Sequence, residues 1–126
     1  MKVGSPFVAL LMAVATLTFI VASAVHFGTS IPLGVVTLDD PFHDAAIPEA
    51  IIAGVMVVGL IGLLAGVWWL ALVTTLFSAA GTILGLSIVL SSAAGRSGDI
   101  AYHVSVLAVL VVTIGLLVTP RARVHT

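Results

Sequence analysis

The chain contains no cysteine. Disulfide bonds, thiolate metal sites, iron–sulfur clusters and thiol redox chemistry are therefore excluded. Charged residues are also scarce, at 7% of 126 residues, whereas ordinary soluble domains have about 25%. Because the net charge is −1 and only four residues are lysine or arginine, the sequence gives no indication of a basic surface that binds nucleic acid, and we expect no nucleic-acid partner.

The usual catalytic motifs are missing as well. The sequence has no G-x-S-x-G nucleophile elbow, no phosphate-binding glycine loop, no dinucleotide fingerprint and no H-E-x-x-H zinc motif. We therefore assign no catalytic residue and favour a protein that is not an enzyme. The sequence identifies no cofactor, and none of its motifs requires one.

What the chain has instead is apolar sequence, which makes up 61% of it. Residues 47–92 contain a single ionised side chain, Glu49, and a single proline, Pro48. A soluble domain cannot bury so long an apolar run, whereas a lipid bilayer can surround it. We interpret this stretch as two membrane-spanning helices joined by a short turn, with one further span on each side.

The predicted fold is therefore an all-α integral membrane protein. One domain, residues 1–126, would hold four transmembrane helices in an up-down bundle. Crossing ~30 Å of hydrocarbon takes about 20 helical residues, which places the spans at about residues 7–27, 48–67, 70–92 and 100–119.

Proline, glycine and aspartate indicate the helix ends. Pro6 and Pro48 suit a first helical turn, where the missing amide donor costs nothing, and Asp99 suits an N-cap. Gly28 suits a helix end. Gly66, just before a pair of tryptophans, is the best position for the turn between the second and third spans.

Basic residues predict the orientation. Lys2, Arg121 and Arg123 lie near the termini, against only Arg96 on the opposite side. By the positive-inside rule, we expect both termini to be cytoplasmic. We also expect the membrane to be the inner (plasma) membrane. The partly apolar loop 28–46 is then extracytoplasmic, and we expect it to lie on the membrane surface or over the helix ends.

Small residues form stripes that let helix backbones approach closely. We expect helix packing through two glycine pairs and the hydroxyl residues of the third span: Gly62, Gly66, Thr75, Ser78, Gly81, Thr82 and Gly85. A similar small face on the fourth span contains Ala101, Ser105, Ala108, Val112 and Gly115. These faces serve either packing within one bundle or contact with another subunit.

Ionisable residues are absent from the middle of every predicted span, although transporters and proton relays usually need them there. His26, Glu49 and His103 instead lie near helix ends at the outer boundary, with His43 and Asp44 in the loop above. Together they could ligate a metal or haem, or line a site for a small amphiphile. The simpler interpretation makes each an interfacial polar residue with a solvated tip.

Two residues bear on whether these side chains form a ligand site or are separate interfacial residues. His103 shares a helix face with leucines rather than with the small face expected to pack, so it need not meet His26. Tyr102 is interpreted as a residue of the aromatic belt at the membrane boundary.

Three functions remain open. The first is a non-catalytic accessory or assembly subunit of a membrane complex, or a homo-oligomeric bundle, with lipid and other membrane subunits as partners. The alternative is a ligand-binding membrane protein with a metal, haem or small-amphiphile site at the extracytoplasmic end. The third is a small transporter or channel, for which Thr75, Ser78 and Thr82 form the one candidate polar path.

Overall fold

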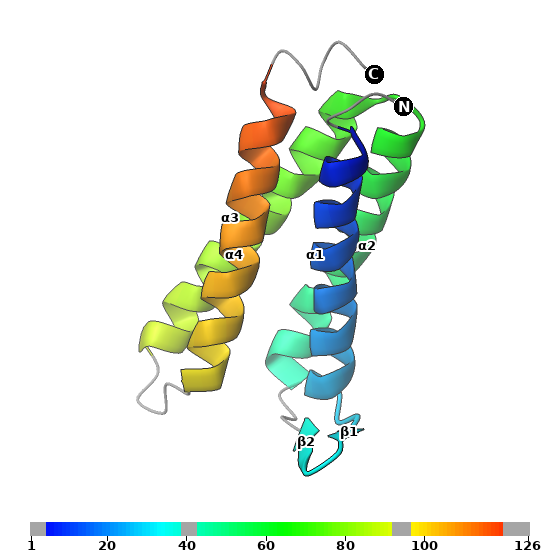
Figure 1. Cartoon of the computed structure of the whole chain (residues 1–126). Helices are drawn as coiled ribbons and strands as arrows, with labels where there is room; N and C mark the ends of the chain where they lie inside the picture. The colour runs from blue at the N-terminus through cyan, green and yellow to red at the C-terminus, as the bar shows by residue number, and fades with distance from the viewer. Residues whose placement is uncertain (1–4, 39–42, 92–96, 120–126) are drawn as a thin grey trace.

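Four long helices make up most of the chain. The computed structural model describes residues 5–38, 43–91 and 97–119. The helices are α1 (Ser5–His26), α2 (His43–Leu64), α3 (Trp68–Ser91) and α4 (Ser97–Leu117) (Figure 1). Each has a stretch long and apolar enough to cross a membrane. The predicted all-helical fold with four candidate spans is confirmed, and it suggests a multi-pass membrane protein.

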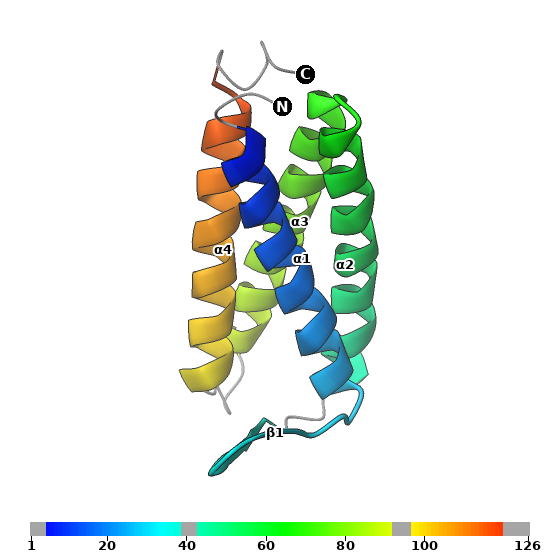
Figure 2. The same cartoon turned by 45° about the vertical axis from the view of Figure 1, so that its right-hand side comes forward.

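The helices pack side by side into one bundle. Helix α1 packs against α2 and α4, and α3 packs against the same two helices. The start of α1, the end of α4 and the α2–α3 turn lie at one end of the bundle (Figures 1 and 2). The opposite end carries the α1–α2 connection, and we call it the hairpin end.

The α1–α2 connection contains a small β-hairpin, which the sequence did not predict. Strands β1 (Ile31–Leu33) and β2 (Val36–Leu38) pair antiparallel, with Leu33 opposite Val36. Gly34 opens the two-residue turn at φ 84°, a conformation that favours glycine. The strands are too short for an alternating pattern to be recognised in the sequence. The hairpin extends past the ends of α1 and α2 (Figure 2).

Two glycines end helices, as predicted. Gly28 and Gly66 have φ angles of 110° and 85°, which place them in the left-handed region. After α2, the Gly66 amide donates to the Leu63 carbonyl at 3.1 Å and the Val67 amide donates to the Gly62 carbonyl at 2.7 Å. This is the Schellman arrangement, which satisfies the last helical carbonyls. Gly66 is exposed, so it serves this turn and not the helix packing expected of it.

Two helix starts differ from the prediction. Helix α2 begins at His43, so Pro48 lies inside the helix instead of at its start. Because proline has no N–H, the helix loses one backbone hydrogen bond there. Helix α4 begins at Ser97, which puts Asp99 in the first turn and not at the N-cap. Its carboxylate still complements the positive end of the helix dipole.

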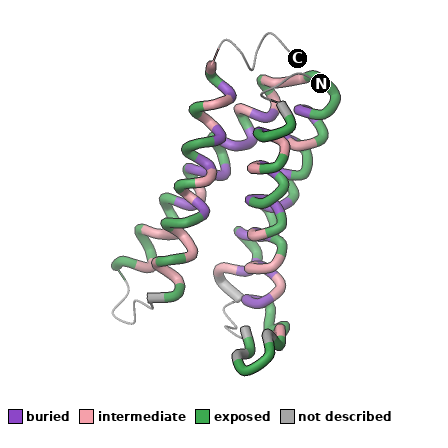
Figure 3. Tube along the Cα trace, in the orientation of Figure 1, coloured by how far each residue is buried: buried purple, intermediate pink, exposed green. Residues whose placement is uncertain are grey.

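The core runs along the bundle axis, between the helices. Met12, Phe19, Met56 and Leu110 are among its largest fully buried side chains. Figure 3 shows buried residues on the inward sides of the helices and exposed ones outside. The exposed residues are themselves mostly large and apolar, which suits an outer surface in contact with lipid.

The hydroxyl residues of α3 face inward. Thr75, Ser78 and Thr82 are all buried. Each hydroxyl donates to the carbonyl four residues earlier in its own helix, at 2.7–2.8 Å. These donors are therefore used within α3 and form no chain of hydrogen bonds along the bundle.

The fourth helix is rotated relative to the expectation. Its small face does not pack inward, because Ala101, Ser105, Ala108, Val112 and Gly115 are all exposed. Helix α4 instead packs through the buried side chains of Val106, Leu110 and Leu117. These bulky side chains fill space that small ones would leave empty, and empty space costs packing energy. The rotation also turns the leucine face, which includes His103, toward the other helices.

Candidate functional site

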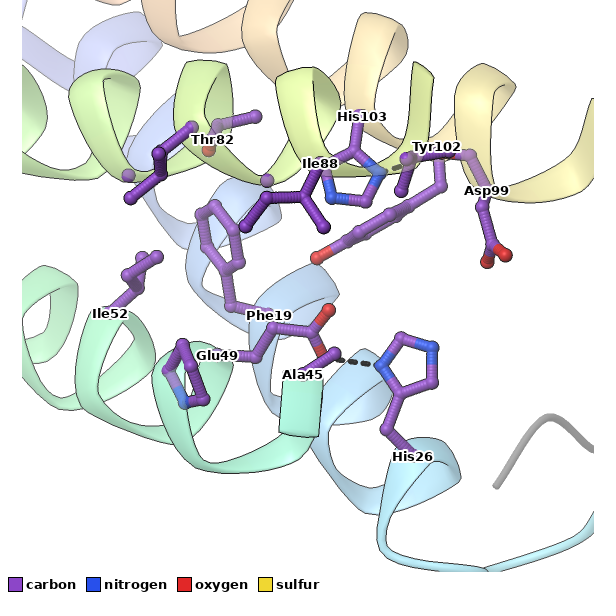
Figure 4. Close-up of a pocket in the computed structure, with 15 residues that line it drawn as sticks. Phe19, His26, Ala45, Glu49, Ile52, Thr82, Ile88, Asp99, Tyr102 and His103 are labelled. Atoms are coloured by element: carbon purple, nitrogen blue, oxygen red, sulfur yellow. Dashed lines mark hydrogen bonds and ion pairs between the residues drawn. The ribbon is translucent and has the colours of Figure 1, made fainter. Parts of the chain in front are cut away.

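A buried pair of ionisable side chains joins α1 to α2 at the hairpin end. His26 Nδ1 lies 2.7 Å from Glu49 Oε2, and each residue is only 6% exposed (Figure 4). One turn away, the Ser23 hydroxyl donates to the Ala46 carbonyl at 2.8 Å. From the sequence we expected His26 and Glu49 to lie at the same depth in the membrane. In the structure their side chains are in direct contact.

This pair lies beside a cavity between the four helices. The cavity has a volume of about 410 Å³. Its wall is mostly apolar, and each of the four helices contributes at least one polar side chain to it. Principal lining residues are Phe19 and His26 from α1, Glu49 and Ile52 from α2, Gly81, Thr82, Gly85 and Ile88 from α3, and Asp99, Tyr102 and His103 from α4 (Figure 4). We call this cavity the pocket.

Tyr102 is a pocket residue that sequence reasoning missed. It is the only tyrosine in the chain. Its hydroxyl oxygen is buried and has no hydrogen-bond partner among the described residues. In Figure 4 this oxygen points across the pocket toward the Glu49 carboxylate. Its position in the sequence could have identified it as a pocket residue. Tyr102 adjoins His103 and follows Asp99 by three residues, so all three lie near the same end of α4.

His103 is fixed by its own helix and by a glycine of α3. Its Nδ1 lies 2.7 Å from the Asp99 carbonyl oxygen, so this nitrogen donates the hydrogen bond. The His103 and Tyr102 rings meet edge to face, with centroids 4.8 Å apart. A Cβ atom on Gly85 would lie 2.8 Å from His103 Nε2. Glycine at position 85 therefore makes room for the imidazole ring.

The glycine pair of α3 thus helps to shape the pocket. A Cβ on Gly81 would lie 2.9 Å from the end of the Ile52 side chain. The close approach expected of Gly81 and Gly85 is present, and what approaches them is pocket side chains of α2 and α4. Gly62 is buried, and a Cβ there would lie 2.8 Å from the Leu70 side chain.

Three of the five predicted site residues line the pocket: His26, Glu49 and His103. His43 and Asp44 are the first two residues of α2, but their side chains lie outside the described part of the structure. Within the described residues, no three His, Asp or Glu side chains are grouped as a metal site requires. The arrangement is instead an apolar cavity with a few convergent polar groups, as is typical of small-molecule sites.

Comparison with protein-family models, curated proteins and solved structures finds no match to this chain. No activity can therefore be carried over from a relative. Function has to be inferred from the chemistry of the pocket and from the apolar helices that surround it.

Proposed function

We propose that this chain is a membrane protein that binds a small amphiphile in the pocket. The observation that carries this proposal is Glu49, a carboxyl group 6% exposed and turned toward an apolar cavity, with the buried Tyr102 hydroxyl opposite it (Figure 4). The apolar wall suits a hydrocarbon tail, and the polar groups suit a head group that forms hydrogen bonds.

The pocket also has a route to lipid. Leu84 and Ile88 line it, yet they are 63% and 58% exposed. The cavity therefore reaches the outer surface of α3, where hydrocarbon chains would lie around a membrane-embedded bundle. An amphiphile already dissolved in the bilayer could enter sideways, without crossing water.

The proposal includes a membrane arrangement. The four helices would cross the inner membrane in up-down order, with the termini in the cytoplasm and the hairpin end outside. Support comes from Lys2, Arg121 and Arg123 near the termini, because basic residues are retained on the cytoplasmic side. The pocket would then lie in the outer half of the membrane.

Reporter fusions test this orientation. Green fluorescent protein fused after Arg123 is expected to fluoresce, because it folds to its fluorescent form in the cytoplasm. Alkaline phosphatase fused at the same position is expected to be inactive, because it needs an oxidising compartment to form its disulfides. Active phosphatase and a dark fluorescent protein would contradict the arrangement.

An amphiphile fits the pocket better than the metal ion that the sequence suggested. A zinc-type site needs three or four protein ligands, and the described side chains provide no such group. A transport path along Thr75, Ser78 and Thr82 has little support, because their hydroxyl donors are engaged within α3. A ligand can enter the pocket while the hydroxyl groups of Thr75, Ser78 and Thr82 keep these hydrogen bonds within α3.

Native mass spectrometry of protein released from phosphatidylcholine nanodiscs tests binding. With dodecanol added, we expect one retained alcohol molecule per chain. Gly85→Leu should lose it, because the new side chain would displace His103 and occupy the pocket. Gly115→Leu is the matched control, since a Cβ at Gly115 meets nothing within 4 Å, and it should retain the alcohol. Equal retention by both variants, or no retention by the unmodified protein, would refute the proposal.

The accessory-subunit or homo-oligomer function is the second candidate. One observation favours it: the small face of α4, including Ala108 and Gly115, is exposed and open to a neighbouring helix. The same mass spectra distinguish the two functions. A dimer, or a co-purifying subunit, with no retained alcohol would favour the second candidate over the first.

A further inference from the structure

The described pocket wall contains acids but no lysine or arginine. Its carboxyl groups belong to Glu49 and Asp99, and its only basic side chains are the imidazoles of His26 and His103. An anionic head group would therefore meet carboxylates with no permanent positive charge among these residues. Repulsion between like charges is stronger in a buried pocket, because water is excluded from it.

Glu49 is positioned to act as a counter-ion. One of its oxygens, Oε2, accepts a hydrogen bond from His26 Nδ1 at 2.7 Å. The other oxygen of the carboxyl group is directed toward the pocket and toward Tyr102 (Figure 4). A carboxylate oxygen accepts hydrogen bonds and donates none, so a ligand group placed there must be a donor.

Tyr102 supplies the second half of the head-group site. Its buried hydroxyl has no partner among the described residues, so it can accept a hydrogen bond from the same ligand group. The rings of Tyr102 and Phe19 both line the pocket. Aromatic faces attract cations through the ring quadrupole, more strongly where water is excluded. Carboxylate, hydroxyl acceptor and aromatic rings together match an ammonium group.

We propose that the pocket selects a lipophilic amine in its ammonium form, with Glu49 as the counter-ion and the hydrocarbon tail along the apolar wall. This inference rests on the proposed function, because it names the head group that the same pocket takes. It adds a preference among amphiphiles that share one tail. Since a single favourable charge pair decides it, the expected preference is about tenfold, or about 1.4 kcal/mol.

Tyr102 provides the reporter. Because it is the only tyrosine, fluorotyrosine incorporation places one fluorine signal in the pocket. The labelled protein in phosphatidylcholine nanodiscs is titrated with dodecylamine, dodecanol and dodecanoate, three head groups on one tail. We expect saturation with dodecylamine at a bilayer mole fraction about tenfold lower than with dodecanol. Dodecanoate should be the weakest of the three. Glu49→Gln should remove most of the difference between amine and alcohol.

The outcomes separate the two proposals. If the three amphiphiles saturate the signal at equal mole fractions, or dodecanoate binds best, the pocket binds amphiphiles but the ammonium inference is wrong. If none gives a saturable shift, the amphiphile function itself is wrong. Titrations of the protein with Glu49 intact are sufficient to distinguish these results. The conclusion therefore does not depend on whether the Glu49→Gln protein folds.

Discussion

Replacing Gly59 with alanine is expected to destabilise the protein by about 3 kcal/mol. Gly59 is buried in α2, where a Cβ atom would overlap the Thr74 side chain of α3 and lie 3.2 Å from the end of Met12 in α1. Thr74 cannot easily move, because its hydroxyl donates hydrogen bonds to the carbonyl oxygens of Leu70 and Ala71. The methyl group can therefore be accommodated only if α2 and α3 separate.

The same substitution at Gly54 is the control. Gly54 lies five residues earlier in α2, and a Cβ there meets nothing within 4 Å. Alanine favours the helical conformation over glycine by about 1 kcal/mol, so Gly54→Ala should leave stability unchanged or raise it slightly. Unfolding in mixed micelles of increasing sodium dodecyl sulfate, followed by circular dichroism, measures both variants. Similar stabilities for the two variants would show that α2 and α3 are not packed at Gly59.

Gly59 also shows where sequence reasoning falls short. The chain has 12 glycines, and spacing alone singled out Gly62, Gly66, Gly81 and Gly85. Three of these four make close approaches or are buried, but Gly66 serves a turn. Gly59 was overlooked because it belongs to no four-residue glycine pair within its helix. Which glycine meets a neighbour depends on helix rotation, and apolar helices in lipid carry no polar face that would indicate it.

The helices themselves were predictable. A bilayer imposes a length of about 20 apolar residues on each span, so four apolar stretches and two glycine ends locate the elements to within a few residues. The hairpin was not predictable, because each of its strands has only three residues. The start of α2 was placed too late because Pro48 suggested a first turn, whereas the helix begins at His43.

The pocket was half predictable. His26, Glu49 and His103 were chosen because ionisable groups are rare in this chain, and all three line the pocket. Tyr102 was not chosen, since an aromatic residue near a helix end usually lies at the membrane boundary. Its role depends on the rotation of α4, which the small-residue face predicted incorrectly. Bulky side chains such as Leu110 decided that rotation by filling the core.

Breaking the His26–Glu49 pair is the second change expected to have a large effect. Removing His26 leaves the buried Glu49 carboxyl group without its hydrogen-bond partner, and breaking a buried pair in this way costs about 3–5 kcal/mol. Both residues are 6% exposed, so little solvent reaches the pair. Protonation of the stranded Glu49 limits the loss, and we therefore expect His26→Ala to reduce stability by about 3 kcal/mol.

The Ser23 hydroxyl offers a matched comparison. It joins the same two helices through the Ala46 carbonyl, also at 23 residues of separation, but neither group is charged. A neutral hydrogen bond contributes about 1 kcal/mol, so Ser23→Ala should cost much less than His26→Ala. The same micelle unfolding assay compares the two variants directly.

A double-mutant cycle separates the pair from its parts. If the two side chains stabilise each other, the double variant His26→Ala with Glu49→Ala will be more stable than the sum of the single effects predicts, by about 1–3 kcal/mol. Additive effects would show that the two residues act independently despite the 2.7 Å contact. One carboxylate cannot interact fully with both His26 and a bound ammonium group. If Glu49 binds the ligand, the coupling energy between His26 and Glu49 should therefore be smaller with dodecylamine bound than in the empty protein.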